Sequence, residues 1–238
     1  MKGAIHAQSS RRVPPRNPKG GRPKQELAAQ LGGHILDVAL DQFVAHGFEG
    51  ASTEKIAAAA NVSKRTLYAR FGSKGALVVA SIEQYTSREL GLIEAAIPNG
   101  SLRKKIGYVA RAMLDMSLQP DVVGVEALVY WLTKHRPGLV EAEPTIGAKV
   151  VIDVMQSVLQ DAPEWRMSGA GDPAELARFL FDVLITVPRH RILRRYEMKN
   201  KAAAKAEYIN QTLDLLASGL PLLRSPEGDD EGRRRQRQ

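Results

Sequence analysis

Apolar residues recur along the chain with the spacing of amphipathic helices. The first clear case follows the i, i+3, i+4, i+7 pattern, in Leu36, Ala39, Leu40 and Phe43. Gly47 then supplies a helix end. No alternating apolar run bounded by turn residues predicts a strand. The pattern therefore predicts an all-α fold of about nine helices, at residues 24–46, 53–60, 64–70, 74–96, 102–118, 122–135, 144–160, 173–196 and 202–219.

Proline and glycine residues mark the gaps between these predicted helices, for example Pro98-Asn99-Gly100 and Pro163. Pro188 falls inside a helical pattern, so we expect it to kink or split that helix. Residues 1–22 and 225–238 are rich in charged residues and offer little apolar surface to bury. We expect the first to be a disordered basic arm and the second a disordered charged tail.

The stretch from Ser52 to Phe71 predicts two short helices joined by a tight turn. Ser52 or Thr53 can cap the first helix, and its small apolar residues share one face. Asn61 occupies the turn, where a left-handed backbone is expected and asparagine is the best substitute for glycine. This arrangement is typical of a helix-turn-helix unit.

The second short helix of this stretch presents its first turn to solvent. Ser63 is a good N-cap, and Leu67 with Phe71 points back to the core. The residues left to face outward are Lys64, Arg65, Thr66 and Tyr68. A helix N-terminus with such side chains fits the major groove of DNA, where Arg or Lys reaches guanine acceptors and backbone amides favour phosphate.

The charge distribution agrees with a nucleic-acid partner. The formal net charge is +8, and residues 1–75 hold 12 Lys and Arg against 5 Asp and Glu. A local excess of positive charge is what a phosphate backbone selects, although a solvated basic helical hairpin would show it too. The chain has no cysteine, no apolar run of about 18 residues and no apolar segment after its basic start. We therefore expect a cytoplasmic, nucleoid-associated protein with no membrane partner.

The residues of this region resemble the tetracycline-repressor (TetR) family. The similarity rests on Gly21-Arg22-Pro23, Ile35-Leu36-Asp37-Val38-Ala39, Phe43, His46-Gly47-Phe48, Ser52-Thr53, Ile56-Ala57, Val62-Ser63, Thr66-Leu67-Tyr68, Phe71, Ser73-Lys74 and Leu77. It implies a homodimer with a helix-turn-helix three-helix DNA-binding head over residues 23–75. It also implies a C-terminal helical domain for ligand binding and dimerisation over residues 76–224. The implied function is a sequence-specific transcriptional regulator, a repressor released from a palindromic operator by a small-molecule effector, although activation is also open.

The resemblance also implies roles for individual residues. Thr53 would touch phosphate, and Tyr68 and Lys74 would grip phosphates on either side of the groove. Arg22 in the preceding arm would reach DNA beside the main contact. The remaining implied contacts to bases or adjacent phosphates come from the cap and first turn of the second short helix, Ser63, Lys64, Arg65 and Thr66. Asn61 and Gly75 replace a usual Gly and a frequent Glu of the family.

The C-terminal part offers candidates of lower specificity. Residues that could line a ligand pocket are Tyr108, Met113, Met116, Tyr130, Trp131, His135 and Phe179, and each could equally belong to an ordinary core. Two apolar stripes could form a four-helix dimer interface, or face only their own domain: Leu176, Leu180, Val183 and Leu184, with Phe179 between them, and Ile209, Leu213 and Leu216.

Two other classes of function compete with this interpretation. An enzyme is disfavoured because the five histidines lack metal-ligand spacing, and we expect neither metal nor cofactor. The sequence Gly169-x-Gly171-x-x-Ala174 loosely matches a dinucleotide fingerprint, but Pro173 lies inside it and Asp172-Pro173 predicts a helix start. The second alternative is a helical ligand carrier with only nonspecific nucleic-acid attachment, which would gain nothing from a shared basic surface on the head.

Overall fold

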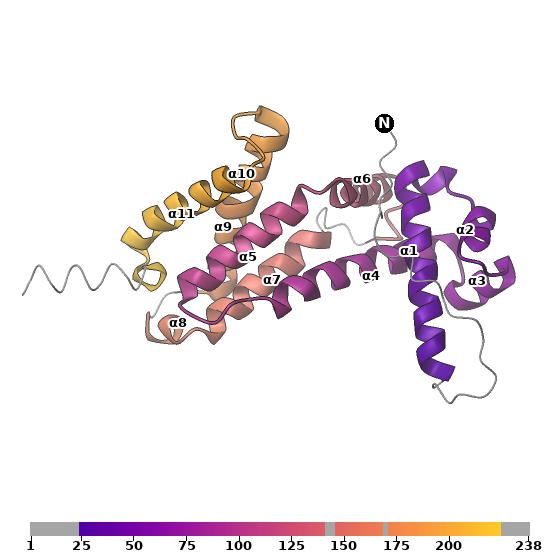
Figure 1. The fold of residues 1–238 in the computed structure, drawn as a ribbon, viewed down its shortest axis with the longest axis horizontal. Coiled ribbons are helices and arrows are strands. Elements are labelled where there is room, and N and C mark those ends of the chain that lie inside the picture. Colours follow the sequence, from indigo (N-terminus) through magenta and orange to yellow (C-terminus); the bar gives the residue numbers. More distant parts are fainter. Residues whose placement is uncertain (1–23, 141–145, 169–170, 225–238) are drawn as a thin grey trace, which may run out of the picture. The chain divides into compact units, whose positions relative to one another are not determined.

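The computed structural model describes residues 24–140, 146–168 and 171–224, which contain helices and no strand. The helices are α1 (Lys24–Gly50), α2 (Thr53–Ala59), α3 (Lys64–Phe71), α4 (Lys74–Ala95), α5 (Leu102–Ser117), α6 (Pro120–His135), α7 (Ile146–Asp161), α8 (Pro163–Ser168), α9 (Pro173–Phe181), α10 (Val187–His190) and α11 (Ala202–Gly219) (Figure 1). Short π and 3₁₀ segments are η1 (Asp182–Thr186), η2 (Arg191–Arg195) and η3 (Pro221–Leu223). The predicted all-α fold is confirmed. None of the described helices is both long and apolar enough to cross a membrane.

Prolines explain where the helices differ from the prediction. The short helix α8 is absent from the predicted set, in which Pro163 only separates helices; here it occupies the first helical position, which suits proline. Pro188 interrupts the long predicted helix over residues 173–196, as expected: this segment is divided into α9, η1, α10 and η2. Proline has no N–H to donate to the fourth preceding carbonyl, that of Leu184, which lies in the π turn η1. Asp172 caps α9 by accepting from the Ala174 N–H at 2.9 Å, so Asp172-Pro173 is a helix start, as predicted.

The described residues form two compact units. The head unit runs to Arg88 and adds the segment from Pro120, which contains α6, while the C-terminal unit contains Glu89–Gln119 and the chain from α7 onward. The helix α4 contributes residues to both units. This division places α6 with the head, whereas the sequence predicts the domain boundary at residue 75.

The head unit is built on side chains that are fully withdrawn from solvent. Ile35 and Phe43 of α1, Ile56 of α2 and Leu67 of α3 are all 0% exposed. Gly47, at φ 69°, ends the regular part of α1 where the sequence predicts a stop. The apolar faces of α1, α2 and α3 thereby meet in one core, which fixes α3 relative to α1.

The helix α6 packs closely on the head. A Cβ added at Gly124 would lie 2.6 Å from Cγ1 of Val44, so α6 and α1 approach as closely as glycine allows. The Trp131 ring lies 6.0 Å from the Phe48 ring, and Arg136 forms an ion pair with Glu49 at 2.5 Å. These contacts explain why α6 belongs to the head unit although it lies far from α2 and α3 in sequence.

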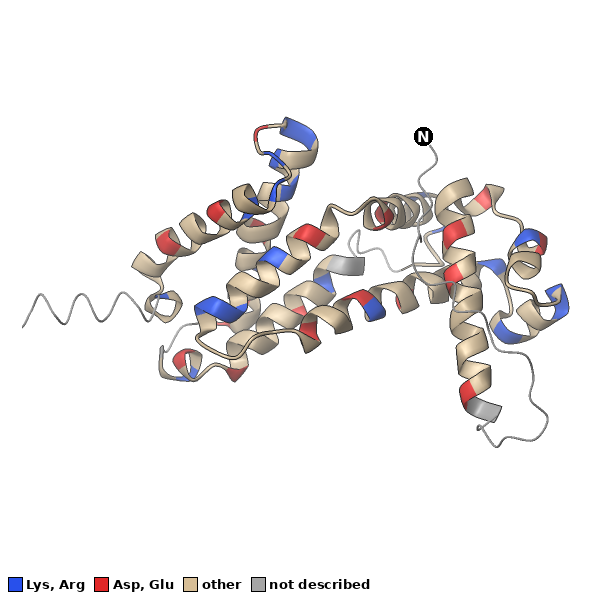
Figure 2. Ribbon diagram, in the orientation of Figure 1, with Lys and Arg blue, Asp and Glu red and all other residues tan. Residues whose placement is uncertain are grey.

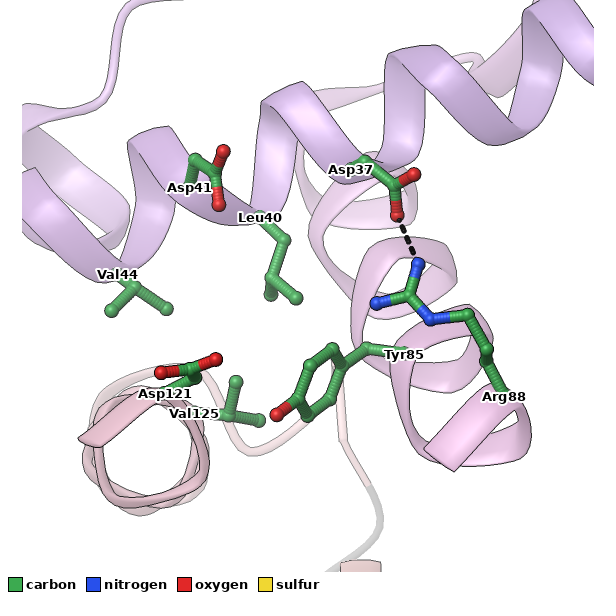
Figure 3. A pocket seen from close by; sticks show the side chains of 8 residues that line it. All are labelled: Asp37, Leu40, Asp41, Val44, Tyr85, Arg88, Asp121 and Val125. Atoms are coloured by element: carbon green, nitrogen blue, oxygen red, sulfur yellow. Dashed lines mark hydrogen bonds and ion pairs between the residues drawn. The ribbon is translucent and has the colours of Figure 1, made fainter. Parts of the chain in front are cut away.

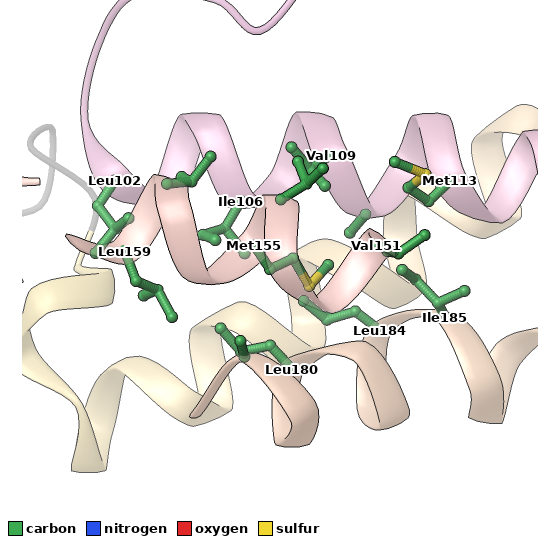
Figure 4. Close-up of a cluster of buried hydrophobic side chains, with 14 of the residues drawn as sticks. Leu102, Ile106, Val109, Met113, Val151, Met155, Leu159, Leu180, Leu184 and Ile185 are labelled. Atoms are coloured by element: carbon green, nitrogen blue, oxygen red, sulfur yellow. The ribbon is translucent and has the colours of Figure 1, made fainter. Parts of the chain in front are cut away.

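The C-terminal unit has its own apolar core, drawn from α5, α7, the α9–η1 segment and α11 (Figure 4). Ile106, Met155 and Leu180 are 0% exposed at its centre. Four residues expected at a dimer interface belong to this core and are at most 1% exposed: Leu180, Leu184, Ile209 and Leu213. Three more pack against it half-buried: Leu176, Val183 and Leu216. The four buried residues thus pack on their own domain, which is one of the two alternatives for these stripes, whereas a dimer contact by the half-buried three stays a prediction.

Candidate nucleic-acid interface

The turn between α2 and α3 has the predicted geometry. Ser52 precedes α2 and its side chain accepts from the Lys55 N–H at 3.4 Å. Asn61 adopts a left-handed conformation at φ 56°. The Val62 N–H donates to the Ala57 carbonyl at 2.9 Å, which closes the turn. The two short helices are thus joined without a linker that could let α3 reorient.

The helix α3 begins at a well-made cap. The Ser63 hydroxyl oxygen accepts from the Thr66 N–H at 3.0 Å and lies 2.8 Å from the Thr66 hydroxyl. Leu67 is 0% exposed and anchors the helix to the head core. The residues of the first turn, Lys64, Arg65 and Thr66, are all exposed. The cap and the buried leucine together hold this turn outward.

Glu54, which the sequence analysis did not single out, pairs with one of these cations. The Lys64 ammonium forms an ion pair with Glu54 of α2. That hydrogen bond, with lesser ones from the Glu54 backbone and Ser52, lowers the pKa of Glu54 to about 2, and the same contact raises the pKa of Lys64. The Lys64 ammonium also lies 5.8 Å from the Tyr68 ring centre. Glu54 and Lys64 are ten positions apart in sequence, so no helical spacing pointed to the pair.

Arg65 stands apart from its neighbours. It is exposed, and within the described part of the chain it has neither an ion pair nor a side-chain hydrogen bond. A guanidinium presents donors in a fixed fork that suits two acceptors at once. Arg65 is therefore the cation of this turn whose donors no described protein group occupies. Arg22, expected to act beside it, lies outside the described residues.

Two residues expected to touch phosphate have internal partners. Thr53 is only 6% exposed, and its hydroxyl lies 3.1 Å from the Tyr68 hydroxyl, so its side chain is placed to orient Tyr68. The Lys74 ammonium donates to the Glu49 carbonyl at 3.2 Å and lies 5.0 Å from the Phe48 ring centre. It thereby supports the end of α1, where a cation is favourable.

The candidate ligand-binding residues are not brought together. Trp131 and His135 of α6 stack on each other at 4.5 Å in the head unit, and Tyr130 beside them is 61% exposed. In the C-terminal unit Met113 is buried, Tyr108 and Met116 pack against the core, and Phe179 is 45% exposed. These seven residues are thus divided between the two units, and a role in ligand binding for any of them stays a prediction.

Two hollows are described, and none of those seven residues lines either. The first lies between α1, α4 and α6 of the head, with a volume of about 10 Å³, which is room for about one water molecule (Figure 3). Asp37 and Arg88 form an ion pair in its wall at 2.9 Å. The second lies in the C-terminal unit, with a volume of about 310 Å³, and is lined by Glu94, Ile97, Lys105, Val154, Ser157, Val158 and Asp161.

Comparison with known proteins gives a consistent result. Residues 35–80 match the bacterial regulatory proteins of the tetR family. The mycofactocin biosynthesis transcriptional regulator MftR of Mycobacterium tuberculosis is 38% identical over 61 residues, which cover 26% of this chain and 31% of MftR. The matched part thus spans about a third of the length of that relative. The DNA-binding transcriptional repressor TetR of Mycobacteroides abscessus is 25% identical over 178 residues, 65% of this chain and 92% of that protein.

A solved structure extends the similarity to the whole fold. A TetR-family transcriptional regulator from Mesorhizobium loti superposes with a TM-score of 0.68 at 20% identity, covering 80% of this chain and 96% of that one. At this identity the likeness concerns the fold alone. Residues 35–80 therefore match the tetR family of bacterial regulatory proteins, and the described helices share the fold of a solved TetR-family regulator.

Proposed function

We propose that this protein is a sequence-specific DNA-binding transcriptional regulator that reads bases with the first turn of α3. The observation that carries the proposal is the exposed Lys64-Arg65-Thr66 turn, held by the Ser63 cap and by buried Leu67. Arg65, whose donors are unoccupied, would contact guanine, and Thr66 an adjacent base or phosphate. The DNA-binding domain would then end at about residue 75, and the part of the chain after it would form the sensing domain.

The other polar residues of the head would position α3 on the phosphate backbone. Tyr68, oriented by Thr53, would donate to a phosphate beside the groove. Lys64 would exchange Glu54 for a phosphate when DNA binds, because a lysine ammonium has three donors and both partners are exposed. Lys74 would add a long-range attraction while it supports α1.

A homodimer would present two such heads to a palindromic operator. One pair of short helices contacts little DNA, whereas a two-fold dimer reads two half-sites about one helical turn, ~34–36 Å, apart. Since the buried stripes serve the core, the dimer contact would use apolar side chains that the core leaves exposed, such as Phe179 (45%) and Leu215 (76%). Leu215→Glu should then shift the sedimentation velocity of the dimer to that of the monomer, whereas Met167→Glu, at a residue 79% exposed on α8, should not.

A small effector would change the affinity of the dimer for DNA. The hollow of about 310 Å³ in the C-terminal unit has the size of a small ligand site, and both apolar and charged side chains line it. A ligand that prefers one of two head separations would shift the population toward it, and weaken or strengthen DNA binding by that preference.

The test is fluorescence anisotropy on labelled DNA flanking the protein's own gene, with excess random DNA and a salt series. We expect nanomolar binding that survives the competitor. Arg65→Ala should lower discrimination between the two DNAs by ~1–3 kcal/mol, whereas Tyr68→Phe should weaken binding to both about equally. Equal losses on both DNAs for Arg65→Ala would exclude base reading by Arg65. Binding only at low salt without preference would favour a ligand carrier with nonspecific attachment.

A further inference from the structure

Among the described residues of the C-terminal unit, the turn between α10 and α11 is strongly basic. Residues 189–201, here called the basic turn, contain one acidic residue, Glu197, and six basic ones: Arg189, Arg191, Arg194, Arg195, Lys199 and Lys201. Residues 76–238 as a whole are nearly balanced, with 22 Lys and Arg against 21 Asp and Glu. Figure 2 shows these positive positions gathered at the end of the unit where η2 turns back into α11. The charge is thus concentrated on a surface that the proposed function does not use.

Interactions within the protein leave much of this charge unbalanced. Glu197 lies 3.9 Å from both Arg191 and Arg195, at the outer limit of an ion pair. Arg194, Lys199 and Lys201 are exposed and have no ion pair in the described ranges. Like charges that gather on one surface repel one another, and an anionic partner would relieve that repulsion.

The local backbone adds to the positive potential. The helix α11 starts inside the basic turn with Lys201 at its N-cap, where no side chain caps it and no acidic residue lies in its first turn. A cation at this end opposes the helix dipole, whereas an anion would be stabilised by it. Tyr196 sits at φ 56°, a conformation that costs a bulky residue free energy, and its side chain is 83% exposed.

We propose that the basic turn is a second nucleic-acid contact, which binds the phosphate backbone without reading sequence. Phosphates at close, regular spacing match a row of arginines and lysines in charge, and exposed charges of this kind supply nonspecific affinity. An anionic membrane fits less well because Ile192 is buried and the turn exposes little aliphatic surface. The proposal rests on the proposed function in one respect: the head brings the same chain to DNA, which raises the local concentration of phosphate.

The experiment compares three full-length variants on a random-sequence duplex, by anisotropy over a range of salt. The first carries Arg194→Gln, Lys199→Gln and Lys201→Gln, which have no ion pair to lose within the described residues. The second, a matched control, removes the same charge from the same unit with Lys104→Gln, Lys149→Gln and Arg224→Gln. The third, Tyr68→Phe, alters the head alone. Circular dichroism and melting curves verify that each variant is folded.

The expected effect is a weaker dependence of binding on salt. The slope of log affinity against log salt should fall by about 0.9 for every phosphate that the variant no longer neutralises, so by about 2–3 in the first variant and by little in the control. Equal changes in these two variants would reduce the effect to net charge and overturn the proposal. If the head did not bind DNA, Tyr68→Phe would change nothing while the first variant still weakened binding. If only binding to phosphatidylserine vesicles, measured by flotation, depended on the basic turn, the partner would be a membrane and the proposal would be wrong.

Discussion

Gly124→Ala should destabilise the head, although alanine is the better helix former. The added Cβ would lie 2.6 Å from Cγ1 of Val44, whereas carbon atoms pack best at about 3.5–4 Å. Val44 is β-branched and lies in α1, so its preferred rotamer is nearly fixed and the helices themselves must separate by about 1 Å. Such overpacking costs about 1–3 kcal/mol, against about 1 kcal/mol gained in helix propensity. We expect a net loss of up to about 2 kcal/mol.

Gly33→Ala provides the matched control, because it lies in α1 of the head and the nearest atom to its added Cβ is the Gln84 side-chain Oε1, at an ordinary contact distance of 3.4 Å. This variant should gain up to about 1 kcal/mol from propensity alone. The fluorescence of Trp131, which stacks on His135 in α6, reports unfolding of the head in urea when Trp165 is replaced by Phe. A second substitution, Val44→Ala, should suppress part of the Gly124→Ala effect by removing the clashing atom.

The outcome discriminates sharply because the two glycine variants have opposite expected signs. If Gly124→Ala stabilised the head as much as Gly33→Ala, the close approach of α1 and α6 would be wrong. If Val44→Ala added its own loss in full, the clash would lie elsewhere.

Three further predictions concern local features. Ser63→Ala removes the cap of α3 and should cost about 1 kcal/mol in urea unfolding, while Ser63→Thr should keep most of it. The pKa of Glu54 is lowered from 4.5 to about 2, so this group contributes stability above pH 4.5 that is lost as the pH falls toward 2. Glu54→Gln should therefore flatten this part of the profile of melting temperature against pH. An unchanged profile would mean that the ion pair with Lys64 does not form. Tyr196→Gly should raise the free energy of unfolding by up to about 1 kcal/mol, because relief of the strain of the left-handed backbone exceeds the entropy that glycine adds to the unfolded chain. A clear loss of stability would show that the tyrosine side chain makes stabilising contacts, contrary to its 83% exposure.

The parts of the head that could be predicted are those set by near neighbours in sequence. The caps at Ser52 and Ser63 and the left-handed Asn61 depend on contacts within a few residues, and all three are confirmed. The effect of Pro188 follows from its missing N–H and was equally predictable.

Features that depend on distant contacts could not be predicted in the same way. Thr53 is buried because its hydroxyl meets Tyr68 of the next helix, so its exposure could not be judged from its place at a helix start. The helix α6 lies on the head through Trp131 and Phe48, which are far apart in sequence, and no local pattern encodes that pairing. The leucine stripe containing Leu180 has the spacing that suits a core and a dimer equally, and only the packed structure distinguishes them.

A contact with a segment far away in sequence also bears on Gly75, which stands where the family frequently has Glu. A Cβ there would lie 2.7 Å from Cδ2 of Leu139, so the segment after α6 packs where a larger residue would project. The departure from the family pattern is thus a packing feature of this chain, visible only once both segments are placed within the head unit.

The central claim, that the first turn of α3 reads DNA sequence, is tested most directly by selection from random duplexes at physiological salt, followed by sequencing of the bound fraction. The account predicts enrichment of a two-fold symmetric motif with half-sites about one helical turn apart, and loss of one guanine preference in each half-site for Arg65→Ala. No enrichment over the input library, or the same motif from the wild type and from Arg65→Ala, would contradict it.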